Sequence, residues 1–139
     1  LSNTSGWCFK FSFKLTGSGG QRFYVGLLNQ VNISNPANYI AIRQDNSEPV
    51  SAFALVINKA NVSTVISLIS VDSAWHTAVI SSTTSGLIEC KFDSLSLVSA
   101  AANFPAAGLT PAMVLVTLSA LAKNAQIDFF AGKVSGLVR

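Results

Sequence analysis

Apolar and polar residues alternate through the first part of the chain. Over residues 6–16, aromatic or aliphatic side chains occupy every second position, and these are Trp7, Phe9, Phe11, Phe13 and Leu15. Side chains two positions apart on an extended backbone share one face, so this pattern predicts a strand with one aromatic face and one polar face. The aromatic face must pack against a second apolar layer, supplied by the later strands or by another subunit.

Similar segments recur along the chain, with turn-forming residues between them. We expect further strands at residues 22–29, 39–44, 51–58, 62–71, 75–81, 87–93, 112–120 and 126–138. The glycine-rich turn at 17–20 favours pairing of the second strand beside the first. Residues 95–110 are rich in alanine and interrupted by proline and glycine, so they predict a short helical turn at most. The regular spacing predicts an all-β fold: a two-layer antiparallel β-sandwich, concanavalin-like or jelly-roll, formed as a single domain by residues 1–139.

The second of these strands is apolar on both faces. Phe23, Val25 and Leu27 face one way, whereas Tyr24 and Leu28 face the other. A strand that is apolar on both sides is covered on both sides. We therefore expect Tyr24 and Leu28 to contact a loop or a second subunit.

The alternation also assigns directions to side chains in other strands. Cys8 falls on the polar face of its strand and Cys90 on the core face, so a disulfide between them would require a different register. In the last strand, Ile127 and Phe129 are expected to point inward, with a bulge at Gly132.

The chain carries few charges for its length. Charged residues make up 11% of the 139 residues, against about 25% in typical soluble domains, and hydrophobic residues make up 50%. Such a surface favours assembly, in which copies of the chain cover one another. The net charge of +3 comes from lysine and arginine residues scattered singly along the sequence, so we expect no nucleic-acid partner. There is no apolar run of about 18 residues and no signal-peptide pattern, so we expect no membrane partner.

Candidate catalytic residues are few. Glu89 and Asp93 would lie about 13 Å apart on one strand, beyond the roughly 5 to 9.5 Å between paired glycosidase carboxylates; with Lys91 between them they predict an exposed charged face. His76, the one histidine, is expected on an outer face without an acid beside it. Two cysteines and one histidine do not make a zinc site. We expect no catalytic residue, no metal and no cofactor, and a protein that is not an enzyme.

The order of these segments resembles a group of viral domains. In the first half the segments concerned are Gly6-Trp7, Arg22-Phe23-Tyr24-Val25-Gly26-Leu27 and Asn38-Tyr39-Ile40-Ala41-Ile42. In the second half they are Trp75-His76-Thr77, Phe104-Pro105 and Ile127-Asp128-Phe129-Phe130. Together they resemble the small jelly-roll or concanavalin-like domains at the outer ends of bacteriophage tail fibres and related virion appendages. The resemblance implies a virion location, a homotrimer, other virion proteins as partners, and no catalytic residues.

The expected function follows from the strand pattern and this resemblance together. We expect a non-enzymatic structural domain of a phage fibre or appendage that attaches to a host receptor, a cell-surface glycan, through exposed loops. The residues expected to contact the receptor are Tyr39, Arg43, Gln44, Asp45 and Asn46. Two alternatives stay open: a capsid or decoration protein with a purely assembly role, and a secreted lectin-like binding module.

Overall fold

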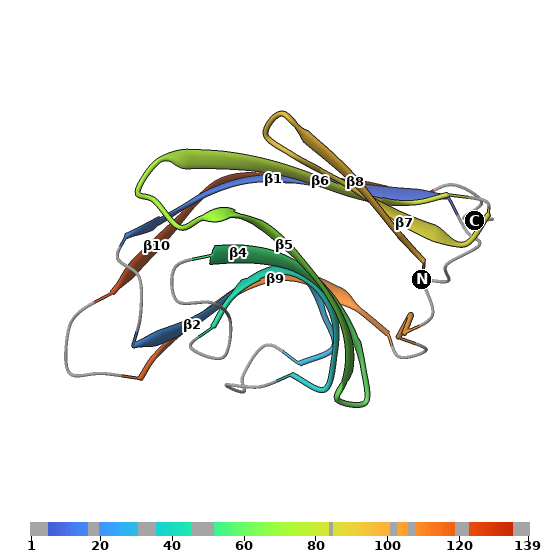
Figure 1. Ribbon diagram of the computed structural model, residues 1–139, viewed down its shortest axis with the longest axis horizontal. Helices are drawn as coiled ribbons and strands as arrows, with labels where there is room; N and C mark the ends of the chain where they lie inside the picture. Colours follow the sequence, from blue (N-terminus) through green and yellow to red (C-terminus); the bar gives the residue numbers. More distant parts are fainter. Residues whose placement is uncertain are drawn as a thin grey trace.

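The computed structural model places the strands of the protein in two stacked sheets (Figure 1). It describes residues 6–16, 20–30, 36–45, 52–83, 85–100, 103–105, 108–118 and 123–134. The strands in these ranges are β1 (Trp7–Thr16), β2 (Gln21–Leu28), β3 (Asn38–Gln44), β4 (Ala52–Lys59), β5 (Val62–Ser70), β6 (Trp75–Ser82), β7 (Leu87–Phe92), β8 (Leu95–Ala100), β9 (Thr110–Thr117) and β10 (Asn124–Val134). No helix in these ranges is long and apolar enough to cross a membrane.

Each sheet contains five of the described strands. Sheet A has the order β10-β1-β6-β7-β8, and sheet B has the order β5-β4-β3-β2-β9. Neighbouring strands are antiparallel throughout. The predicted all-β, two-layer antiparallel sandwich is therefore confirmed. Both sheets bend in the same direction, so the outer side of sheet A is convex and the outer side of sheet B is concave (Figure 1).

The aromatic face of β1 lies at the centre of the core between the sheets. Phe11, Phe13 and Leu15 are fully buried. The centroid of the Phe13 ring lies 5.3 Å from that of Phe23 in β2 and 5.4 Å from that of Phe53 in β4. One side chain of sheet A thus contacts two strands of sheet B, and the same chain supplies the second layer that the pattern required.

The neighbours of β1 differ from those predicted. β1 lies between β10 and β6, with Trp7 opposite Val134 on one side and Ser82 on the other. β2 lies in the other sheet, between β3 and β9. The expectation that the second strand pairs beside the first is wrong, because the chain crosses from one sheet to the other between them. Alternation determines which side chains are buried but does not determine which strand is the neighbour.

A strand also forms where none was expected. Residues 95–100, predicted to lie outside any strand, form β8 at the edge of sheet A. Its residues pair with β7, with Leu97 opposite Cys90 and Leu95 opposite Phe92. Leu95 and Leu97 thus lie on the same side of sheet A as the buried residues of β7. Pairing with β7 makes this segment a strand, although its alanine-rich sequence did not predict one.

The last strand is bulged at a different place from the one predicted. The register of β10 shifts where it pairs with Ser12 and Phe13, not at Gly132. Phe129, predicted to point inward, lies opposite the outward Ser12 and is exposed, and Phe130 packs against the core instead. Ile127 lies opposite the inward Phe13, as its predicted direction requires, but is exposed on this edge strand. At Gly132 a β-carbon would lie 2.3 Å from Cε1 of Phe9, so the absence of a side chain makes room for that core ring.

The concave side of sheet B carries a second buried cluster. Its fully or almost fully buried members are Tyr24, Leu28, Tyr39, Ala41, Ala54, Val56 and Val114. At Gly26, where φ is +153°, a β-carbon would lie 2.4 Å from the backbone oxygen of Ile40, so glycine permits the close approach of β2 and β3. Tyr24 and Leu28 have no exposed surface in the single chain, so a second subunit is not needed to bury them; that contact stays a prediction.

Candidate functional site

The outward side of sheet A, which we call the convex face, combines charged, hydroxyl and aromatic side chains. Because β1 directs its aromatic residues inward, the residues between them point outward, and the strand registers extend this pattern across the sheet. The convex face includes Cys8, Lys10, Ser12 and Lys14 of β1, Trp75, Thr77, Val79 and Ser81 of β6, Glu89 and Lys91 of β7, and Gln126, Phe129, Ala131 and Lys133 of β10.

Two aromatic rings are exposed on the convex face. Trp75 is 49% exposed and Phe129 is 37% exposed. Phe129 lies opposite Ser12 and Trp75 lies opposite Lys14, so the two residues flank β1 from either side. Lys10 Nζ lies 5.5 Å from the centroid of the Phe129 ring, within cation–π distance. Aromatic and cationic groups therefore form one mixed surface.

Two adjacent hollows indent the same face. One, of about 400 Å³, lies over β6, β7 and β8, and its lining includes Val79, Ser81, Glu89, Lys91 and Ser96. The other, of about 240 Å³, lies at the start of β1, and its lining includes Cys8, Ser81 and Lys133. Ser81 borders both hollows, so they adjoin. Their hydroxyl, carboxylate and ammonium groups can donate and accept the hydrogen bonds of a polyhydroxylated ligand.

The residues predicted to contact a receptor lie in the other sheet. Tyr39 and Arg43 point outward from β3, and Arg43 Nη1 donates a hydrogen bond of 2.7 Å to Tyr39 Oη. Gln44 points toward the sandwich interior and is buried, and Asn46 lies outside the described residues. Tyr39 is 1% exposed and Asp45 is 4% exposed, so neither offers surface to a receptor in this structure. Their role in receptor binding stays a prediction.

Tyr24 of β2 completes a covered tyrosine and arginine cluster on the concave side. Its ring meets that of Tyr39 edge-on, with the centroids 5.3 Å apart, and Arg22 Nε lies 3.3 Å from Asp45 Oδ2 nearby. Burial, followed by the proximity of Tyr39 and Asp45, raises the pKa of Tyr24 from its ordinary 10.0 to about 12. The buried Tyr24 hydroxyl has no hydrogen-bond partner among the described residues.

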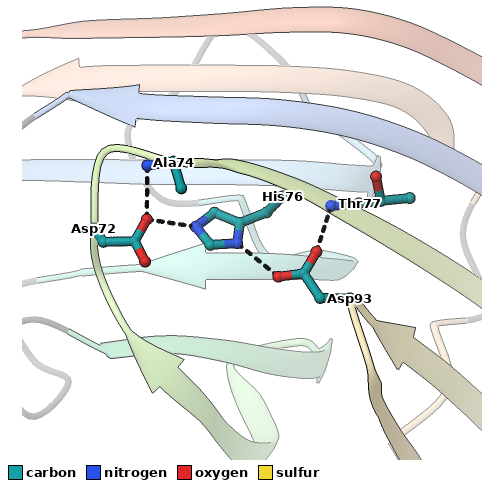
Figure 2. Close-up of polar contacts among 5 residues, drawn as sticks. All are labelled: Asp72, Ala74, His76, Thr77 and Asp93. Carbon is teal, nitrogen blue, oxygen red and sulfur yellow. Dashed lines mark hydrogen bonds and ion pairs between the residues drawn. The ribbon is translucent and has the colours of Figure 1, made fainter.

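His76 is the buried centre of a hydrogen-bond cluster whose two carboxylates reach the surface, shown in Figure 2. It lies on the inward side of β6 and is 3% exposed, which corrects the expectation of an outer-face histidine. Its ring lies between two carboxylates, with Nδ1 2.8 Å from Asp93 Oδ2 and Nε2 3.0 Å from Asp72 Oδ1. Backbone amides hold both acids, since Thr77 N donates to Asp93 over 2.8 Å and Ala74 N donates to Asp72 over 2.7 Å.

This cluster joins the two sheets and is not arranged for catalysis. Asp72 belongs to the connection from β5 in sheet B to β6 in sheet A, and Asp93 belongs to the turn between β7 and β8. Both nitrogens of His76 are engaged by protein carboxylates, so neither faces a substrate. Within the described ranges, no group of three histidine, cysteine or acidic side chains is placed to hold a metal ion.

The Asp72 carboxylate makes stability depend on pH. The hydrogen bond from Ala74 N, and after it the one from His76, lowers the pKa of Asp72 below its ordinary 3.8. A carboxylate whose pKa falls on folding contributes stability above its unfolded pKa and loses it as pH falls through the folded value. Asp72→Asn should therefore unfold at a lower temperature than the wild type near neutral pH, with the difference disappearing in acid.

Thermal unfolding scans between about pH 7 and about pH 2 test this expectation. Ser73→Ala, from the same exposed connection, is the control, because it removes no charge. A difference between Asp72→Asn and the wild type that stays constant over the whole range would contradict the expected pH dependence.

Comparison with known proteins identifies the fold but no sequence family. The sequence matches no protein-family model and no curated protein. Among solved structures, a protein of unknown function from Shewanella oneidensis MR-1, SO2946, superposes with a TM-score of 0.67 at 17% identity over 96% of this chain and 59% of that one. Alginate lyase A1-II', a member of polysaccharide lyase family 7, superposes with a TM-score of 0.62 at 12% identity over 99% of this chain and 65% of that one.

Two further similar structures broaden the range of functions on this fold. A carbohydrate esterase from the Shiga toxin-encoding bacteriophage phi24B superposes with a TM-score of 0.54 at 15% identity over 95% of this chain and 69% of that one. CG-16, a homodimeric agglutinin from chicken liver, superposes with a TM-score of 0.55 at 10% identity over 96% of this chain and 95% of that one. At these identities the likeness shows a shared fold alone.

These comparisons correct one prediction. The chain was expected not to be an enzyme, but alginate lyases and a carbohydrate esterase share its two-sheet architecture, so that exclusion is wrong. The chain spans only about 59% to 65% of the length of SO2946 and the alginate lyase. Structures of this β-sandwich type thus include carbohydrate-active proteins, one of them from a bacteriophage.

Proposed function

We propose that this chain is a carbohydrate-binding domain and that it binds its glycan on the convex face of sheet A. The observation that carries the proposal is the exposure of Trp75 and Phe129 on one face, beside lysines and hydroxyl groups. The C–H faces of a sugar ring pack on aromatic rings, while its hydroxyl groups need polar partners nearby. The hollows beside Ser81 supply such partners on the same surface.

We further propose that the domain belongs to a bacteriophage fibre or appendage and attaches the particle to a cell-surface glycan as a homotrimer. The resemblance of its strand segments to such domains supports this setting. The carbohydrate esterase of bacteriophage phi24B, which shares the fold, adds support for a phage context. Light scattering tests the trimer, and a monomer at every concentration would count against it.

Binding to a glycan array, followed by affinity measurement on the best ligand, tests the carbohydrate proposal. Trp75→Ala and Phe129→Ala should each weaken binding about tenfold, because each removes a ring on which a sugar packs. Val62→Ala and Val65→Ala are matched controls, since these valines are also exposed apolar residues but lie in β5 of the other sheet. A loss of affinity in the valine variants, or unchanged affinity in the aromatic variants, would contradict the proposed site.

A further inference from the structure

The convex face gathers lysines that are widely spaced in the sequence. The face carries four lysines, which are Lys10, Lys14, Lys91 and Lys133. The one acid at its strand positions is Glu89, so these positions have a net charge of +3. Asp128, the extra residue at the bulge of β10, is exposed at the edge of the sheet. Sequence spacing alone had suggested scattered cations, and strand pairing brings them together.

These lysines differ from the arginines of the concave side in having no hydrogen-bond or ion-pair partner among the described residues. Arg22 pairs with Asp45, and Arg43 donates to Tyr39. None of the four lysines forms an ion pair with another described residue. A face with unpaired cations favours a ligand that brings its own negative charges.

The strand registers place three of the lysines along a line that crosses the strands. Lys10 and Lys91 lie in one row, both opposite Val79 of the strand between them, so their backbones are about 10 Å apart, twice the spacing of neighbouring strands. Lys133 lies on β10 opposite Cys8, which is two residues before Lys10 on β1, so Lys133 and Lys10 are diagonal neighbours. The Phe129 ring lies beside Lys10, the middle lysine of the line, and the line ends at the hollow that Lys91 borders.

We propose that the ligand of the convex face is an acidic polysaccharide laid across β10, β1, β6 and β7. Its carboxylate or sulfate groups bind Lys133, Lys10 and Lys91, and one of its sugar rings packs on Phe129. Glu89 lies within the larger hollow, where its carboxylate accepts hydrogen bonds from sugar hydroxyls. Glu89 repels any anionic group that lies against it, so the face favours a chain whose charges are separated by neutral hydroxyl-bearing positions. An acidic polysaccharide meets this requirement better than the closely spaced phosphates of a nucleic acid do. This inference rests on the proposed carbohydrate binding and specifies the class of ligand.

Polygalacturonate and its fully methyl-esterified form are the probes, because they share one backbone and differ in charge. Titration calorimetry at about 50 mM and about 200 mM salt should show binding of the acidic form that weakens as salt rises, and little binding of the ester. Lys10→Gln and Lys91→Gln should each weaken binding about three- to fivefold. Lys59→Gln, at the β4–β5 hairpin of the other sheet, removes the same charge and should bind as the wild type does.

These experiments distinguish a failure of the acidic-ligand inference from a failure of the proposed carbohydrate binding. Equal affinity for the two polymers would overturn the inference and leave carbohydrate binding standing. No binding to any carbohydrate on the array would overturn both. Equal losses in Lys59→Gln and Lys10→Gln would show an effect of net charge and contradict the site. Tighter binding of single-stranded DNA than of polygalacturonate would also overturn the inference, in favour of a nucleic acid.

Discussion

Replacing Phe13 with alanine is expected to lower the free energy of unfolding by about 3 to 5 kcal/mol. The Phe13 side chain is fully buried at the centre of the core. Its ring contacts Phe23 and Phe53 of sheet B and also His76 and Phe92 of sheet A. Alanine would leave a cavity that both sheets border, and two stacked sheets cannot close it without losing their own packing.

Denaturant unfolding of Phe13→Ala beside Phe129→Ala measures this effect. Phe129 is the matched control, because it is a phenylalanine of the same sheet that points outward and is partly exposed. Its removal should change the free energy of unfolding by about 1 kcal/mol or less. A loss below about 1 kcal/mol in Phe13→Ala would contradict the position given to the aromatic face of β1.

Replacing His76 with alanine is expected to cost about 3 kcal/mol of stability. The change removes a ring that stacks on Phe92, with centroids 5.2 Å apart, and meets Phe53 edge-on at the same distance. It also removes both hydrogen bonds to Asp72 and Asp93, which leaves the two acids without the group between them. The crossing from β5 to β6 should loosen as a result.

Thr77→Ala is the control for the histidine variant. Thr77 is the next residue along β6, and its side chain points outward. Its backbone amide donates to Asp93, and this hydrogen bond remains when the side chain is changed to alanine. The control should therefore lose less than about 1 kcal/mol. If denaturant unfolding gave equal losses for His76→Ala and Thr77→Ala, the imidazole would not be the structural link that the geometry indicates.

Much of the fold followed from local alternation, because burial repeats with a period of two along each strand. The faces of β1 and β2 were predicted in this way, including the second apolar face that holds Tyr24 and Leu28. The neighbours of each strand were not predictable by the same means, since pairing depends on contacts between distant segments. The glycine-rich link after β1 was interpreted as a hairpin, although the chain crosses there to the other sheet.

The candidate sites were harder to predict than the fold. In the His76 cluster, Asp72 lies four residues before the histidine, so this contact could have been suspected from the sequence. Asp93 reaches the His76 ring only because the chain turns after β7, where Asp93 has a φ of 51°. The same turn takes Asp93 out of the charged face predicted for it beside Glu89 and Lys91.

The convex face was partly visible as well. Lys10 and Lys14 were on the predicted polar side of the first strand, whereas Lys91 and Lys133 join them only through the order of strands in sheet A. The exposed Phe129 could not be predicted, because a bulge beside it reverses the alternation of β10.

The two outer sides of the sandwich therefore differ in what they offer a ligand. On the concave side, Tyr24 and Tyr39 lie covered among apolar neighbours, and the nearby cations already contact protein groups. On the convex side, Trp75 and Phe129 are exposed beside lysines that have no described ion pair. Within the described surface, the outer side of sheet A is therefore the one that offers a glycan exposed rings, hydroxyl groups and unpaired charges together.

Amide chemical shifts followed by NMR during addition of oligogalacturonate test this difference most directly. Binding on the convex face predicts the largest changes at the amides of Lys10, Ser12, Thr77 and Lys91, with those of Arg22 and Tyr24 unchanged. Changes centred on β2 and β3 in sheet B, with β1 and β6 unaffected, would contradict it.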